Sequence, residues 1–172
     1  MKVCAPAFSK KTILLGLVII FSACFVRKIY NYLLQYITRQ ELGYVIFFLL
    51  IVFCIAFSYY VRKNNLNFFQ WTATICIFFI IGFLSLRLKL IEERIHLVEY
   101  ALLGIFAARD NQKTNLSFLY SAIFVSFIGL LDEIYQYFLP GRYFDWRDVF
   151  FNFVGGSLGG LLYIVSKRRV PK

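Results

Sequence analysis

The residues from 130 to 152 bring side chains capable of chemistry into an otherwise apolar part of the chain, LLDEIYQYFLPGRYFDWRDVFFN. Carboxylates can transfer protons or bind cations, and a guanidinium can bind a phosphate or carboxylate through two parallel hydrogen bonds. Ionisable groups are costly in lipid, so this stretch predicts either a functional site or a polar clasp between helices. The groups concerned are Asp132, Glu133, Gln136, Arg142, Asp148 and Asn152.

A second polar group precedes this stretch, in RIHLVEYALLG at 94–104. At helical spacing, Lys89, Glu92, His96 and Glu99 fall on one narrow stripe. A histidine titrates near neutral pH, so His96 beside a carboxylate is a candidate general base or proton relay. The duller interpretation is an interfacial histidine that is hydrogen-bonded to Glu92 or Glu99.

Helical spacing also arranges the later polar residues. Gly129, Asp132 and Gln136 share one stripe, whereas Glu133 points toward a different neighbour. A further stripe joins Asp148, Asn152, Gly155 and Gly159. The glycines Gly155, Gly156, Gly159 and Gly160 allow close helix approach in lipid.

The composition places these stripes in a membrane. Of 172 residues, 60% are hydrophobic and 16% are charged, and the mean hydropathy is +0.70, which indicates a single integral membrane domain. The net charge of +10 is scattered over every predicted loop, so it favours contact with anionic lipid headgroups rather than nucleic acid.

Apolar segments predict an all-α, polytopic helical membrane bundle of about six transmembrane helices, with five as the alternative. The fourth segment is expected to extend back to a start near Leu88, and the fifth to continue to Leu139, where Pro140 ends it. The segments are 12–26, 42–61, 68–86, 95–108, 116–131 and 149–166.

Alternating helices would place the start of helix four, the end of helix five and the start of helix six at the same membrane face. Slightly more Lys and Arg lie on the side of both termini, which favours a cytoplasmic N-terminus and C-terminus. The polar residues are then expected to form one cluster at the extracytoplasmic face.

The order of these residues resembles the VanZ-like family of bacterial integral membrane proteins. RIHLVEYALLG and LLDEIYQYFLPGRYFDWRDVFFNFVGGSLGG carry the resemblance, which defines a core at 88–166 and leaves 1–87 as three additional N-terminal transmembrane helices. It implies a bacterial cell membrane location and a link to glycopeptide antibiotic resistance, but no particular reaction. The implied polar signature is His96, Tyr100, Asp132, Glu133, Gln136, Arg142, Asp148 and Asn152.

Three functions fit this pattern. The first is a cell-envelope protein that binds or remodels an amphiphilic ligand, such as a membrane lipid, a lipid-linked precursor or an antibiotic, with Arg142 on its anion. The alternative is an intramembrane hydrolase or transferase with a His, carboxylate and Arg site; a divalent metal suits these residue types, although their spacing matches no metal signature. A proton-coupled carrier is the third, disfavoured because the polar residues occupy one end of the bundle.

Overall fold

The computed structural model describes residues 5–33, 66–88 and 91–167, and the single positions 35, 36, 38, 41, 44, 48 and 59. Across these residues there is no strand, so the predicted all-α class is confirmed for the described part of the chain. The helices described as complete elements are α1 Lys10–Leu33, α3 Phe68–Arg87, α4 Ile91–Asp110, α5 Ser117–Tyr137 and α6 Trp146–Ser166.

Three of these helices are long and apolar enough to cross a membrane: Phe68–Ser85, Ser117–Tyr137 and Trp146–Ser166, with mean hydropathies of 1.8, 1.6 and 1.6. They correspond to the predicted segments 68–86, 116–131 and 149–166. Segments 12–26 and 95–108 lie inside α1 and α4. The predicted segment 42–61 lies almost wholly outside the described residues, so the total of about six spans stays a prediction.

The expected start of the fourth helix near Leu88 is wrong. Leu88 is extended (φ −75°, ψ 134°) and caps α3, because its N–H donates to the carbonyls of Leu84 and Ser85. Helix α4 begins at Ile91, and the guanidinium of Arg94 donates to the Leu88 carbonyl at 3.1 and 3.0 Å. This contact joins the first turn of α4 to the C-cap of α3.

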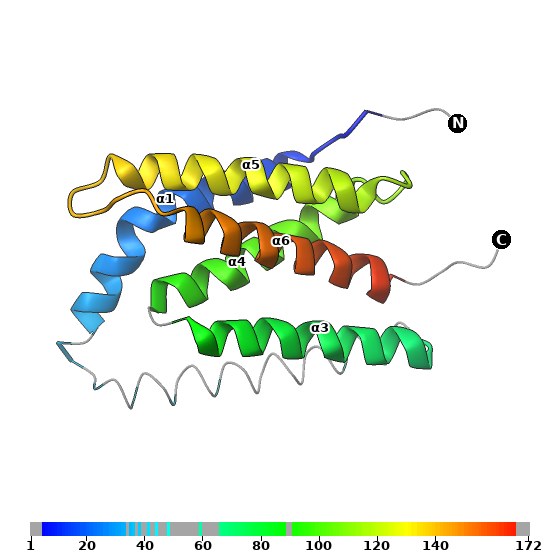
Figure 1. Cartoon of the computed structure of the whole chain (residues 1–172), viewed down its shortest axis with the longest axis horizontal. Coiled ribbons are helices and arrows are strands. Elements are labelled where there is room, and N and C mark those ends of the chain that lie inside the picture. Colours follow the sequence, from blue (N-terminus) through cyan, green and yellow to red (C-terminus); the bar gives the residue numbers. More distant parts are fainter. Residues whose placement is uncertain are drawn as a thin grey trace.

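Helix α5 ends two residues earlier than expected. Its last residue is Tyr137, and a turn follows in which the Leu139 N–H donates to the Gln136 carbonyl at 2.9 Å. Gly141 then has φ 73°, a left-handed conformation that glycine adopts without steric cost. The turn reverses the chain and places the start of α6 beside the end of α5 (Figure 1).

Helix α4 occupies the centre of the described bundle and contacts α1, α3, α5 and α6. Figure 1 shows α3, α4, α5 and α6 lying lengthwise beside one another. The side chains of Leu97, Tyr100 and Leu103 are fully buried on α4, and Tyr100 and Leu103 join a core with Ile19 and Val125. One face of α4 is therefore covered by its neighbours, while Val98 and Leu102 are exposed on another.

Glycines set the distance between α4 and α6. A Cβ on Gly155 would lie only 2.7 Å from the carbonyl oxygen of Leu97, and one on Gly159 would collide with the carbonyl of Ala101. The same holds for a glycine of α4: the carbonyl of Gly156 on α6 occupies the space that a Cβ on Gly104 would need. The two backbones are in direct contact, as small residues permit in helices packed within lipid.

Side-chain hydrogen bonds join the helices at the end of the bundle where α1 and α3 begin and α4 and α6 end. The side-chain amide of Gln70 donates to the carbonyls of Val165 and Lys167 at 3.0 and 3.1 Å. Asp110 accepts from the Ser9 N–H at 2.8 Å and from the Thr12 hydroxyl. These bonds pair polar groups at the ends of the helices and connect α1 and α3 to the other helices.

We predict that Gly159→Ala lowers the free energy of unfolding by about 1–3 kcal/mol, because the new methyl group overlaps backbone that cannot move aside alone. Gly82→Ala is the matched control: outside its own turn of helix, no atom of the described residues lies within 4 Å of its Cβ position, so alanine should be neutral or stabilise the helix by about 0.5–1 kcal/mol. Thermal unfolding in detergent measures both, and equal changes would contradict the close α4–α6 contact.

Candidate functional site

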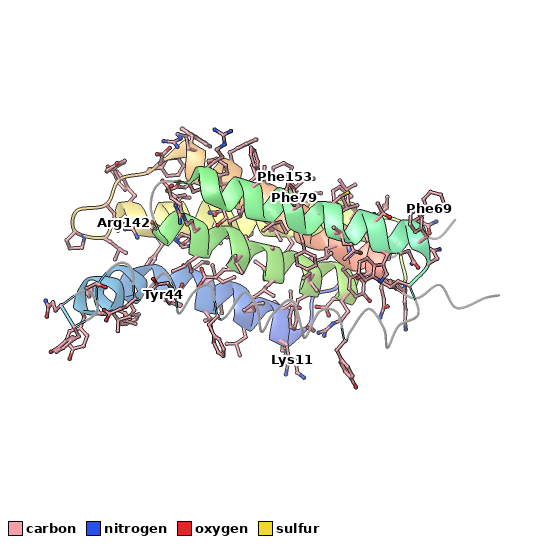
Figure 2. The ribbon with its side chains drawn as sticks, turned by 90° about the horizontal axis from the view of Figure 1, so that it is seen from below. Lys11, Tyr44, Phe69, Phe79, Arg142 and Phe153 are labelled. Carbon is pink, nitrogen blue, oxygen red and sulfur yellow. The ribbon has the colours of Figure 1, made fainter. Side chains whose placement is uncertain are left out.

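Three helix ends meet at one end of the bundle: the start of α4, the end of α5 and the start of α6 (Figure 1). Figure 2 places Arg142 at this end of the bundle and Phe69, in the first turn of α3, at the opposite end. Seven predicted residues lie around this junction, and we call them the polar cluster. They are His96, Glu99, Tyr100, Asp132, Gln136, Arg142 and Asn152.

The carboxylate of Asp132 lies at the centre of the polar cluster. Its side chain is fully buried, and its Oδ2 accepts a hydrogen bond of 3.0 Å from the hydroxyl of Tyr100, which is also fully buried. A buried carboxylate is costly unless donors or positive charges compensate it. The Tyr100 hydroxyl supplies one donor from the neighbouring helix.

His96 faces two carboxylates. Its Nδ1 lies 3.3 Å from Oε2 of Glu99, one turn along α4, and 3.8 Å from Oδ2 of Asp132 on α5. Neither contact has the geometry of a hydrogen bond, since Nδ1 is a buried atom without a hydrogen-bond partner. The contacts are therefore ionic whenever the ring is protonated. Arg142 is close enough to interact electrostatically with the same ring.

Gly129 makes room for Asn152 beside this carboxylate. A Cβ at Gly129 would lie 3.0 Å from the Cβ of Asn152 and 3.6 Å from Cε1 of Tyr100. Asn152 is buried at 2% exposure, in the second turn of α6. The absence of a side chain on α5 thus lets an amide from α6 and a phenol from α4 approach the same point.

Several buried polar atoms of the cluster have no hydrogen-bond partner among the described residues. Donors and acceptors are both present, and each such group costs about 1–3 kcal/mol when it is left unpaired. Native proteins rarely leave groups in this state, and a concentration of them marks a place where water or a ligand binds. The atoms are Asp132 Oδ1, Glu99 Oε2, His96 Nδ1, Gln136 Nε2, Arg142 Nη2 and Asn152 Nδ2.

Glu133 and Asp148 lie beside the polar cluster, near the start of α6, and both interact electrostatically with His96. Oε2 of Glu133 accepts from the backbone N–H of Asp145 at 3.1 Å, so this side chain faces a different neighbour from Asp132, as its helical position predicts. Asp145 is the N-cap of α6 and accepts from the Arg147 N–H at 2.8 Å. Asp148 follows in the first turn, where a negative charge interacts favourably with the helix dipole.

The structure does not describe the whole of the stripe that helical spacing predicts on the fourth helix. Lys89 and the side chain of Glu92 lie outside the described residues. Arg142 forms no ion pair with any acid in the described ranges, so the loop is not closed by a salt bridge there. Within those same ranges, no group of three or more His, Cys, Asp and Glu side chains could hold a metal ion.

Sequence reasoning did not identify two backbone contributions. The Asp145 N–H binds Glu133, and the Leu88 carbonyl binds Arg94. Side-chain type gives no signal for either, because both depend on where a helix ends. The preference of aspartate for helix N-caps was the one available indication of the first.

We predict that Tyr100→Phe lowers the free energy of unfolding by about 1–3 kcal/mol, because the buried Asp132 carboxylate loses its donor while the aromatic packing remains. Tyr143→Phe is the control, since Tyr143 is 77% exposed and should change stability little. Both variants are compared by thermal unfolding in detergent. A Tyr100→Phe protein as stable as wild type would show that the hydrogen bond contributes nothing.

Comparison with known proteins places this arrangement in a family. The VanZ/LLP1 family model matches residues 12–167, a range that includes α1 and α3 as well as the helices of the polar cluster. No match was found among curated proteins or solved structures. Since the family model covers most of the sequence, the chain belongs to the VanZ/LLP1 family.

Proposed function

We propose that this protein binds an amphiphilic ligand of the bacterial cell envelope through the polar cluster, with Arg142 on the anionic group of that ligand. The observation that carries the proposal is the set of unpaired buried donors in the cluster. Arg142 Nη2 and Gln136 Nε2 come from the end of α5 and the following loop. A guanidinium with an unpaired Nη2 suits the oxygens of a phosphate or carboxylate, and the Gln136 amide is a second unpaired donor of the polar cluster.

The surroundings of Arg142 support a ligand drawn from the membrane interface. Phe138, Tyr143 and Trp146 flank it in sequence and are 75%, 77% and 71% exposed. Exposed aromatic side chains at a helix end are typical of the headgroup layer of a bilayer. With both termini in the cytoplasm, this end of the bundle faces outward, where envelope lipids, lipid-linked precursors and amphiphilic antibiotics are met.

Binding of phosphatidylglycerol by the full-length protein, titrated in detergent and detected by native mass spectrometry, tests the role of Arg142. Arg142→Gln should weaken binding about tenfold or more, because a charge-assisted hydrogen bond to the phosphate is lost. Arg147→Gln is the matched control: it removes an exposed arginine at the same end of the bundle.

A second readout links the site to the physiology that the VanZ-like resemblance implies. In bacteria that depend on this protein for reduced glycopeptide susceptibility, Arg142→Gln should restore susceptibility and Arg147→Gln should not. Equal lipid affinity for the two variants would reject the proposed binding role of Arg142 and favour a purely structural clasp.

The geometry of His96 favours a second candidate, an intramembrane hydrolase or transferase that acts on a lipid-linked substrate. Its Nδ1 faces Glu99 and Asp132, which leaves Nε2 as the nitrogen that could accept a proton from a nucleophile. Arg142 would stabilise negative charge that develops on the substrate.

For this candidate, His96→Gln should abolish turnover of a lipid-linked phosphate substrate and retain phosphatidylglycerol binding within a few-fold. Mass spectrometry of the extracted lipids measures the product. The catalytic role is rejected if the wild-type protein releases no product, or if the variant releases as much.

A further inference from the structure

We infer that the ligand headgroup is zwitterionic: Asp132 and Glu99 hold an ammonium group while Arg142 holds the neighbouring anion. This inference rests on the proposed function and adds the second charge of the ligand. A single anion would use the donors of the polar cluster and leave its carboxylate oxygens unpaired. The unpaired carboxylate oxygens therefore indicate that the ligand also carries a positively charged hydrogen-bond donor.

The buried charge of this protein is acidic although the chain has a net charge of +10. Among the described residues, the side chains of Asp, Glu, His, Lys and Arg that are buried as a whole are those of Asp132, Glu133 and His96; Arg142 is partly exposed, although its Nη2 is buried. A buried carboxylate requires a positive partner or a proton. The anion of the ligand would take up the charge of Arg142, so a positive group on the same ligand would compensate the carboxylates that His96 faces.

Two carboxylate oxygens have the capacity to bind that cation. Tyr100 occupies Oδ2 of Asp132 and leaves Oδ1 without a partner, and Oε2 of Glu99 is also without a hydrogen bond. His96 lies beside both carboxylates. A primary ammonium carries three donors and no acceptor, so it suits oxygens that lack a hydrogen-bond donor, including Glu99 Oε2, whose contact with His96 Nδ1 at 3.3 Å is ionic.

Asp132 and Arg142 lie close to the same histidine, since both interact electrostatically with His96. Such proximity fits an ammonium and an anion joined by a short aliphatic linker, as in phosphoethanolamine. The Glu99 side chain is 25% exposed and that of Asp132 is 0% exposed, so the ammonium would reach Asp132 past Glu99.

The test compares phosphatidylethanolamine with phosphatidylglycerol, titrated into the full-length protein in detergent and detected by native mass spectrometry. The two lipids share the phosphate and differ in the ammonium. We expect phosphatidylethanolamine to bind about tenfold more tightly. Asp132→Asn should reduce its affinity to that of phosphatidylglycerol, because the amide keeps the shape of the side chain and an acceptor for Tyr100 but loses the charge.

Glu99→Gln should remove most of the preference for phosphatidylethanolamine. Because Glu99 is partly exposed, this variant keeps the test valid if Asp132→Asn fails to fold. Asp110→Asn is the matched control, since Asp110 lies at the other end of α4 and should leave the preference unchanged. Excess soluble O-phosphoethanolamine identifies the source of the headgroup. Displacement of the lipid indicates recognition of the free zwitterion, and a retained preference without displacement indicates a lipid.

Equal affinity for the two lipids, or a preference that survives both Asp132→Asn and Glu99→Gln, overturns the zwitterionic headgroup. If phosphatidylglycerol binding still depends on Arg142 in that case, the proposed anion site stands by itself. If Arg142→Gln changes the affinity for neither lipid, or neither lipid binds the wild-type protein, the proposed function fails and the inference fails with it.

Discussion

The direct contact between the backbones of α4 and α6 is the constraint on which the rest of this bundle depends. Gly155 and Gly159 bring α6 against the carbonyls of Leu97 and Ala101, and no larger residue could occupy these positions without separating the helices. The contact fixes the first turns of α6 relative to the His96 turn of α4. The polar cluster is then a consequence of apolar packing, because glycines deeper in the bundle decide where its side chains lie.

This rigid contact explains how the protein tolerates a polar cluster that is incompletely hydrogen-bonded. Unpaired buried groups cost about 1–3 kcal/mol each, which is a large part of the stability of a typical domain. Helices that could rotate would turn such groups toward water or toward one another. Gly129, pressed against Asn152, leaves α5 little freedom to do so. The stability lost in the polar cluster is offset by the packing of α4, α5 and α6 beneath it.

Helical periodicity was sufficient to predict which side chains share a face. It placed His96 with Glu99, separated Glu133 from Asp132, and, with the alternation of helices, brought the ends of α4, α5 and α6 together. It could not predict which oxygen of Asp132 receives the Tyr100 hydroxyl, because that depends on the rotation and axial offset of two helices. These quantities are set by contacts such as Gly159 against Ala101, which are specific to the packed pair.

The ends of the helices were harder to predict for a related reason. Leu88 is apolar and follows an apolar run, so nothing in its side chain distinguishes the cap of one helix from the first residue of the next. Leu88 is the cap of α3 because its N–H bonds to α3 and its carbonyl accepts from Arg94. Apolar composition locates a helix in a membrane but does not locate its ends, since lipid stabilises any regular, internally hydrogen-bonded segment.

Binding and catalysis make different demands on the same polar cluster, and His96 is the residue at which they diverge. A binding site needs the carboxylates of Glu99 and Asp132 to be available to the ligand. A catalytic site needs those carboxylates to stabilise the imidazolium, so that Nε2 can take a proton. An ammonium held by the same oxygens would compete with the imidazolium for them. A zwitterionic ligand would therefore favour neutral His96, and the two functions would be exclusive for that ligand.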